Sequence, residues 1–466
     1  MKKIYRYIIS LVITFSIFLH GADNEFILPD IEEYQLNNGM RILISPNYES
    51  PVVYIKTYIT VGEIDDPVDK PDLGDYAFDE LYKGTKKYPK KNQLKEKLFS
   101  LGNTHGKFEK FWLNNDYGEI DHICLKEDTR DCIEIFAEVL RNPTFPFHGK
   151  LAQKLAVSFA PKNTFANTWR TRWYHVNNMY NNKVERFNPK YSLSYNKKDV
   201  RNWHKQNIRP ENITLMISGD INYIYIKKII NEFFGDWEVK DKIPNQRVFN
   251  INVTNDSGID IRFISLEDED RASMLILKKT TDLNKFWDPS IQMALYVFGN
   301  IGNNRIDKIH QKVDRAGWMK QGWSQSNRMP LMYIQIEIEY YLQEKLYSEL
   351  LSEFENLTYN SISKEELELA KITRINDYRN KTYNPQELND FVQAYYNSNG
   401  YSLEKIQKMI DDINAVTLEE VNAAAKKVFD PNNFVMAITG NKDSCATFIS
   451  QLENVEFYEQ AEEIRP

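Results

Sequence analysis

The chain has 466 residues, of which 42% are hydrophobic, and a formal net charge of −7. At roughly 100–200 residues per domain, this length predicts two or three domains, each able to bury a core. The 59 lysine and arginine residues face 66 aspartate and glutamate residues, which excludes the strong positive field of a nucleic-acid-binding protein. Three cysteines are too few for a disulfide scaffold or a four-cysteine zinc site. No two of the seven histidines lie three to five residues apart, which excludes a local histidine pair as a metal clamp.

The N-terminus has the pattern of an export signal. Lys2, Lys3 and Arg6 form a positive segment, and the apolar run at 8–19 that follows is too short for a typical membrane span. We therefore predict a signal peptide at residues 1–22 and a mature protein that is periplasmic or secreted, with no stable membrane span after cleavage. A signal that stays uncleaved as an anchor is the alternative.

The remaining chain contains a long internal repeat. Residues 210–220 and 431–441 share Pro, Asn, Ile and Gly at a constant offset of 221 positions. In each copy a helix-like stretch comes first, Pro ends it, an apolar strand follows and Gly turns the chain. A repeat of this length indicates tandem domains rather than a solenoid.

The elements predicted for the first half alternate between strand and helix. In chain order they are a hairpin with its Asn-Gly turn at 36–44, a strand at 52–61, helices at 73–81 and 92–100, a strand at 118–125, and helices at 130–140 and 223–234. The absence of repeated strand–helix–strand units favours an α+β fold over a doubly wound sheet. Because charged residues, Pro and Asn cluster at 238–246, we place the two domains at 24–240 and 247–466.

Short motifs run through both halves in a fixed order. They are Leu36-x-Asn38-Gly39-Met40-Arg41-Ile42, Val61-Gly62-Glu63, Leu81-Tyr82-Lys83-Gly84-Thr85, Asn142-Pro143-Thr144-Phe145-Pro146, Arg209-Pro210-Glu211-Asn212, Phe234-Gly235-Asp236-Trp237, Gly299-Asn300-Ile301-Gly302-Asn303-Asn304 and Val416-Thr417-Leu418-Glu419-Glu420-Val421. Their order and spacing resemble the insulinase/pitrilysin family of zinc peptidases, which includes the mitochondrial processing peptidases. The resemblance implies two homologous α+β domains, each a sheet with helices packed on it, usually paired across a cleft that holds an extended peptide.

The sequence departs from that family where its catalytic motif belongs. Active members carry H-x-x-E-H on a helix, in which two histidines bind Zn²⁺ and the glutamate is the general base. Counted back from Thr85, the motif falls on Asp75, Phe78 and Asp79. Both histidines are therefore aspartates, and phenylalanine replaces the base. Two carboxylates suit Mg²⁺ or Ca²⁺ better than zinc, but an acidic, solvated helix edge is the simpler interpretation.

The third zinc ligand of the family is also missing. The resemblance implies a glutamate in the helix after Asn-Pro-x-Phe-Pro, yet residues 150–160 contain no carboxylate at all. A shift of a few residues in the alignment does not restore it. We therefore expect no metal and no other cofactor, although zinc is the family's usual metal.

The second half has only weak counterparts of the family's substrate-binding residues. The family commonly supplies an arginine and a tyrosine about seven residues apart, and the closest candidates here are Arg315 and Trp323. A tryptophan is a poor substitute for the tyrosine, and a place in the core or the cleft wall explains it as well. The stretch 169–175 alternates cations and aromatic residues, which fits either a peptide groove or a packed surface helix.

The leading hypothesis is a non-catalytic, exported homologue of the insulinase/pitrilysin family. We expect it to form a heterodimer with a catalytically intact homologue and to contribute part of a cleft for a peptide or unfolded polypeptide. A stand-alone peptide-binding module is the main alternative. The remaining alternative is an active metallopeptidase that uses Asp75 and Asp79 as unusual ligands.

Overall fold

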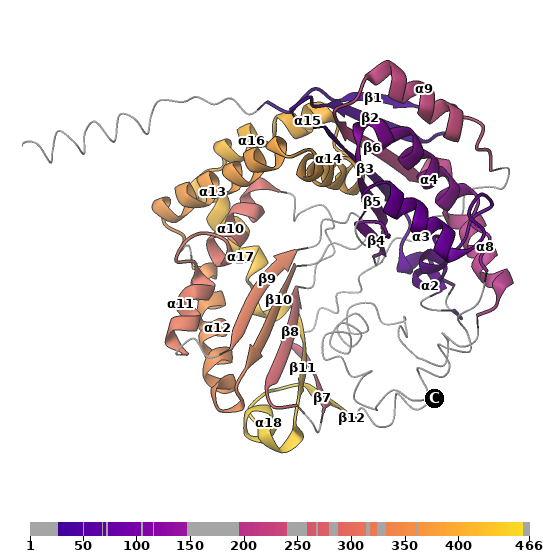
Figure 1. Ribbon diagram of the computed structural model, residues 1–466. Helices are drawn as coiled ribbons and strands as arrows, with labels where there is room; N and C mark the ends of the chain where they lie inside the picture. The colour runs from indigo at the N-terminus through magenta and orange to yellow at the C-terminus, as the bar shows by residue number, and fades with distance from the viewer. Residues whose placement is uncertain are drawn as a thin grey trace, which may run out of the picture.

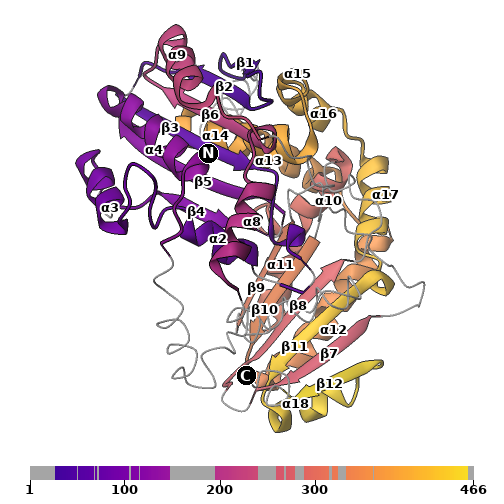
Figure 2. The same cartoon turned by 90° about the vertical axis from the view of Figure 1, so that its right-hand side faces the viewer.

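Two β-sheets with flanking helices form the two sides of an open arch, and helices of the second half join them at its closed end (Figures 1 and 2). The computed structural model describes residues 27–49, 51–67, 69–70, 73–103, 106–114, 116–146, 195–239, 259–266, 269–278, 288–313, 317–323, 332–359 and 361–459. The predicted signal peptide, most of the predicted domain boundary and the 150–160 and 169–175 stretches lie outside these residues. No helix among the described residues combines the length and the apolar character needed to span a membrane.

The first module contains a six-stranded sheet. Its strands are β1 (Glu32–Gln35), β2 (Arg41–Pro46), β3 (Val52–Ile59), β4 (Lys110–Leu113), β5 (Gly118–Leu125) and β6 (Ile213–Gly219), in the spatial order β1-β2-β6-β3-β5-β4. Strands β2 and β6 pair in parallel, and the other neighbours are antiparallel. The predicted hairpin is correct: Gly39 takes a positive φ of 92° in the turn between β1 and β2, a conformation that glycine adopts without strain.

The second sheet repeats this arrangement. Its strands are β7 (Asp260–Ser265), β8 (Ala272–Lys278), β9 (Trp318–Trp323), β10 (Met332–Ile338), β11 (Phe434–Gly440) and β12 (Val455–Glu459), in the order β12-β7-β11-β8-β10-β9. Strands β6 and β11 begin 221 positions apart, at Ile213 and Phe434. The edge strands β1 and β12 differ, because β1 is antiparallel and β12 parallel to its neighbour. The predicted α+β fold with two homologous domains is therefore confirmed.

Helices cover the sheets in both modules. The first module has α2 (Leu73–Glu80), α3 (Lys91–Ser100), α4 (Thr129–Arg141), α8 (Lys197–Asn207) and α9 (Tyr223–Phe234). The second has α10 (Pro289–Gly299), α11 (Arg305–Lys312), α12 (Gln343–Thr358), α13 (Lys364–Tyr383), α14 (Pro385–Asn399), α15 (Leu403–Gln407), α16 (Met409–Ala415), α17 (Leu418–Val428) and α18 (Lys442–Ile449). Every helix predicted for the first half is present. The short edge strand β4 was not predicted, because its four residues carry no clear alternation.

Helix α14 joins the two modules. It belongs to the second half of the chain but packs on β3 and β6 of the first sheet, as Figure 1 shows at the top of the arch. Leu43 and Met216 of the first sheet accordingly belong to the same apolar cluster as the core of the second module. Four side-chain hydrogen bonds reinforce this contact, namely Asn389 to Tyr54 O (3.3 Å), Gln393 to Lys56 O (3.0 Å), Thr214 to Asn397 Oδ1 (2.6 Å) and Ser218 to Pro385 O (2.9 Å).

Candidate functional site

Helix α2 carries the three positions of the degenerate motif. Its start is fixed by Asp66, whose Oδ1 accepts hydrogen bonds from Gly74 N (2.8 Å) and from Trp203 Nε1 of α8 (2.9 Å). A side chain at Gly74 would lie 2.6 Å from Asp66 Oδ1, so glycine is required for this close approach. The helix packs against α8 and β4, which holds its orientation at the edge of the first sheet.

Phe78, at the position of the general base, points into the core. Its side chain is 1% exposed, and its ring lies 4.9 Å from that of Phe111 on β4. Phe111 in turn contacts Phe108 and Tyr82, so an aromatic cluster occupies the space beside α2. A group at this position is shielded from solvent. An apolar side chain therefore stabilises the helix at the position where the family resemblance predicts the general base.

Asp75 and Asp79 lie on the exposed side of the same helix, one turn apart. The next acidic residue, Glu80, is buried and pairs with Lys83 at 2.6 Å instead of joining them. Within the ranges that the structure describes, no group of three His, Cys, Asp or Glu side chains is arranged to hold a metal ion. The donor set on α2 thus consists of two solvated carboxylates without histidine, and it does not fit the zinc centre that the family resemblance implies.

The structure describes one of the two residues suggested for substrate binding. Arg315 lies outside the described residues, so its position is not known. Trp323, at the end of β9, packs against the second core, with its ring 5.9 Å from that of Tyr296 and 6.0 Å from the guanidinium carbon of Arg374. These contacts make Trp323 part of a packed wall in the second module.

Arg374 on α13 is the centre of a buried polar cluster next to Trp323. Its guanidinium donates to Gln292 Oε1 (3.1 Å), Tyr296 OH (2.7 Å) and Tyr395 OH (2.8 Å), and it stacks on Tyr378 at 4.2 Å. Neutral oxygens satisfy all three of these donors. We call these five residues the Arg374 cluster. Since its donors are already paired within the protein, it is a structural centre.

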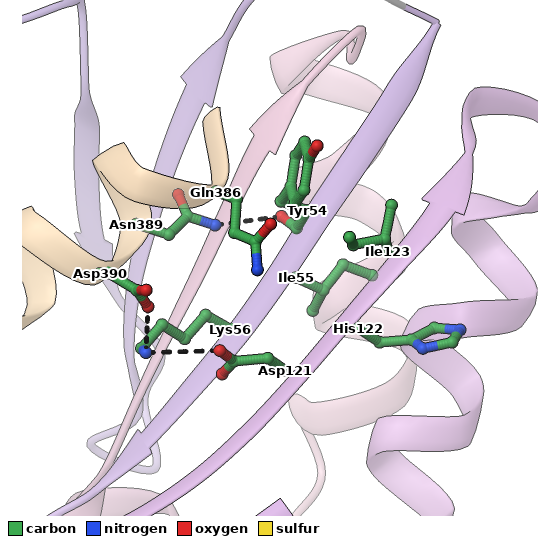
Figure 3. Close-up of a pocket in the computed structure, with 9 residues that line it drawn as sticks. All are labelled: Tyr54, Ile55, Lys56, Asp121, His122, Ile123, Gln386, Asn389 and Asp390. Atoms are coloured by element: carbon green, nitrogen blue, oxygen red, sulfur yellow. Dashed lines mark hydrogen bonds and ion pairs between the residues drawn. The ribbon is translucent and has the colours of Figure 1, made fainter. Parts of the chain in front are cut away.

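A second buried charge cluster lies between the modules and was not predicted. Lys56 on β3 is 3% exposed, and its Nζ lies 2.7 Å from Glu119, 3.5 Å from Asp121 and 2.5 Å from Asp390 of α14. Figure 3 shows Lys56 with Asp121 and Asp390. Lys110 on β4 also reaches Asp121 (3.5 Å) and Asp390 (3.1 Å). These five residues are the Lys56 cluster. The sequence signal was a lysine inside the mostly apolar run 52–59, and the sheet places it directly across from an aspartate.

Burial and charge act in opposite directions on these groups. Burial raises the pKa of Asp121 to about 6, an effect that Lys56 only partly offsets. Burial also opposes the charge on Lys56, but Glu119, Asp121 and Asp390 outweigh it and raise the pKa of the lysine. For Asp390, Lys56 and Lys110 outweigh burial and hold the pKa below its usual value. Asp121 therefore binds a proton more readily than Asp390 does.

Comparisons with known proteins agree on one family. The model of the peptidase M16 inactive domain matches residues 194–373. The fold resembles that of a protease from Helicobacter pylori, with a TM-score of 0.76 and 13% identity over 89% of this chain and 100% of that one. A peptidase M16 inactive domain from Pseudomonas fluorescens has a TM-score of 0.70 and 14% identity over 88% of this chain and 98% of that one. No curated protein matches the sequence.

A third similar structure has a longer chain. The periplasmic protease PqqL from Escherichia coli matches with a TM-score of 0.67 and 14% identity, over 91% of this chain but 49% of that one. The structure of its first half matches with a TM-score of 0.68 and 15% identity, over 91% of this chain and 94% of that one. These identities establish the shared fold, and the sequence match over 194–373 adds the family's own signature. The sequence match over residues 194–373 and the shared fold support a relationship to the insulinase/pitrilysin family, peptidase family M16.

Proposed function

We propose that this chain is a non-catalytic M16 homologue that pairs with a catalytically intact homologue and contributes part of a peptide-binding cleft. The observation that carries the proposal is the placement of three side chains on α2. Phe78 is buried in an aromatic cluster where a peptidase has its general base, and the two flanking aspartates lie on the solvent side. A preserved two-module scaffold without the catalytic groups suits binding and positioning better than hydrolysis.

The fold match to the E. coli protease supports the pairing. This fold accounts for about half of that longer chain, so it occurs there as one part of a larger protein. A separate, intact homologue would supply the other part for this chain. The same protease is described as periplasmic, which agrees with the export signal that we predict at residues 1–22. We therefore infer that the protein acts outside the cytoplasm, on peptides or unfolded polypeptides.

Co-expression tests the partner role. The full chain would be produced with a two-module homologue from the same genome that retains H-x-x-E-H, and the hydrolysis of a fluorogenic peptide would be followed in zinc-containing buffer. We expect the two proteins to co-purify and the rate to rise roughly tenfold over that of the homologue alone, about 1.4 kcal/mol in activation free energy. No association and no rate change would overturn the proposal. Binding of the same peptide by this chain alone, with no effect of the homologue, would favour the stand-alone binding module instead.

Restoring the motif tests the loss of catalysis. The triple variant Asp75→His, Phe78→Glu, Asp79→His rebuilds the family's pattern on α2. We expect no zinc-dependent hydrolysis, since the third ligand is missing, and a lower melting temperature because Phe78→Glu buries a charge. The double variant Asp75→His, Asp79→His is the matched control and should fold normally, because both positions are exposed. Zinc-dependent hydrolysis by the triple variant, or by the unmodified chain, contradicts the proposal.

A further inference from the structure

The Lys56 cluster has one more negative charge than positive charges. Three carboxylates (Glu119, Asp121 and Asp390) face two ammonium groups (Lys56 and Lys110), all within the salt-bridge distances given above. The cluster is enclosed by the face of the first sheet and by α14 of the second module (Figure 3). A buried excess charge is costly, because little solvent is available to stabilise it. One additional proton would make the cluster neutral.

The structure indicates which oxygen would take that proton. Asp121 is 5% exposed, its Oδ2 faces both lysines, and its Oδ1 has no hydrogen-bond partner. Glu119, by contrast, receives Lys56 on one oxygen and Trp112 Nε1 on the other at 2.8 Å. Asp390 is held by both lysines and is one-third exposed. Asp121 also lines a small hollow with Asn389, whose buried Oδ1 likewise has no donor.

We propose that Asp121 takes up a proton from solvent in mildly acidic solution and that this neutralises the Lys56 cluster and tightens the contact between α14 and the first sheet. The cluster thus acts as a proton-sensitive clamp between the modules. Only a proton moves, from water to Asp121 Oδ1, and no bond between heavy atoms changes. This role is independent of peptide binding and of the proposed partner.

The direction follows from the Asp121 pKa of about 6, which is above its usual value near 3.8. Because the pKa of Asp121 is raised while α14 is docked on the first sheet, protonation of Asp121 favours the docked state. The stabilisation is therefore gained as the pH falls through 6 and absent well above it. Lys56 and Asp390 do not titrate between pH 5 and 8, because the pKa of Lys56 is raised and that of Asp390 is lowered. Tyr117, next to Glu119, is neutral throughout this range since burial raises its pKa.

Hydrogen exchange of the α14 amides measures this local opening directly. Lifting α14 exposes Asp121 to water and returns its pKa toward 3.8, so the protection factors of α14, corrected for intrinsic exchange, should rise about tenfold between pH 8 and pH 5. Helix α18, at the far end of the second module in Figure 1, is an internal control and should show no such change. His122 does not interfere, because it points to the opposite face of β5 and stays buried while only α14 opens (Figure 3).

The variant Asp121→Asn, which mimics the protonated side chain, should remove the pH dependence and keep the protection of α14 high at pH 8. Asp443→Asn, an exposed aspartate on α18, is the matched control and should behave like the unmodified protein. The wild-type measurement decides by itself if a variant does not fold. Protection of α14 that is unchanged between pH 8 and 5, or that keeps its pH dependence in Asp121→Asn, overturns the proposal.

Discussion

Helix α14 lies between two buried cations that are stabilised by different kinds of partner. On the side of the first module, Lys56 is surrounded by three carboxylates, one of them on α14 itself. On the side of its own module, Arg374 is surrounded by Gln292 and the hydroxyls of Tyr296 and Tyr395, with Tyr378 beneath it. Both cations are almost fully buried, at 3% and 6% exposure. The chemical difference therefore lies in the partners and not in the depth of burial.

The two kinds of partner respond differently to pH. Burial raises the pKa of Tyr296, Tyr378 and Tyr395 above the usual tyrosine value, so the Arg374 cluster keeps the same charge at every pH near neutrality. The carboxylates of the Lys56 cluster include one with a pKa of about 6. The tyrosine partners of Arg374 thus keep their protonation state near neutrality, whereas the contact of α14 with the first sheet includes a carboxylate whose pKa lies in this range. The Arg374→Met and Lys56→Met predictions below test this contrast.

The largest effect is expected for Arg374→Met. The substitution removes three hydrogen bonds from a charged donor, each contributing about 1.5–3 kcal/mol, and leaves buried hydroxyls with fewer partners. We expect the free energy of unfolding to fall by about 4 kcal/mol, equally at pH 5 and pH 8, in urea denaturation followed by tryptophan fluorescence. Lys364→Met, which removes an exposed cation from the same helix, should stay within about 0.5 kcal/mol of wild type. A loss below about 1 kcal/mol for Arg374→Met would contradict this account of the cluster.

A smaller loss is expected for Lys56→Met. Removal of the central cation leaves Glu119 and Asp121 buried without their main partner, which we expect to cost about 3 kcal/mol at pH 8 and less at pH 5, where Asp121 is protonated. Adding Asp121→Asn should recover more than about 1 kcal/mol of this loss, and a double-mutant cycle with the two single variants measures the coupling. Strict additivity at pH 8 would show that the two side chains do not interact.

The repeated fold explains why this cluster escaped prediction. Strand register makes Lys56 and Asp121 of the first sheet equivalent to Leu275 and Gln335 of the second, since each pair lies directly across neighbouring strands. The sequence repeat predicted the shared backbone, because Pro, Gly and the apolar strand pattern act locally. The pairing of Lys56 with Asp390 depends on how α14 docks, 334 residues later in the chain. Nothing in the local sequence indicates that contact.

The degenerate motif was easier to locate than to interpret. The Leu-Tyr-Lys-Gly-Thr stretch at 81–85 predicted a helix just before it that carries Asp75, Phe78 and Asp79, and α2 is found there, at Leu73–Glu80. Whether Phe78 faces solvent or core is decided by tertiary packing, namely by Phe111 on a short edge strand that was not predicted. Trp323 shows the same limitation, because its packing next to Arg374 depends on α13, about 50 positions further along the chain. Local patterns therefore predicted the positions, and long-range contacts determined their surroundings.

The smallest effect is expected for His122→Phe. His122 is 1% exposed, neither ring nitrogen has a hydrogen-bond partner, and its ring packs edge-on against Phe108 at 5.7 Å. Replacing the unsatisfied imidazole by a benzene ring should raise the free energy of unfolding at pH 7 by about 1 kcal/mol. His204, whose Nε2 donates to Leu140 O over 2.8 Å, is the matched comparison, and His204→Phe should be destabilising. A destabilised His122→Phe would indicate a hidden partner for the imidazole.

His122 and Asp121 make the stability of this protein depend on pH in opposite directions. Burial lowers the pKa of His122 to about 4, so the neutral ring stabilises the fold above pH 6.5, and this stability is lost as the pH falls from 6.5 to 4. The loss amounts to about 2 kcal/mol at pH 5 and should disappear in His122→Phe. Asp121, the preceding residue on β5, has the opposite sign and faces the opposite side of the sheet. Global unfolding therefore reports His122 together with His204 and Asp121, whereas local opening of α14 reports Asp121. His122→Phe should remove the contribution of His122 from the pH profile of global unfolding and leave that of local opening intact.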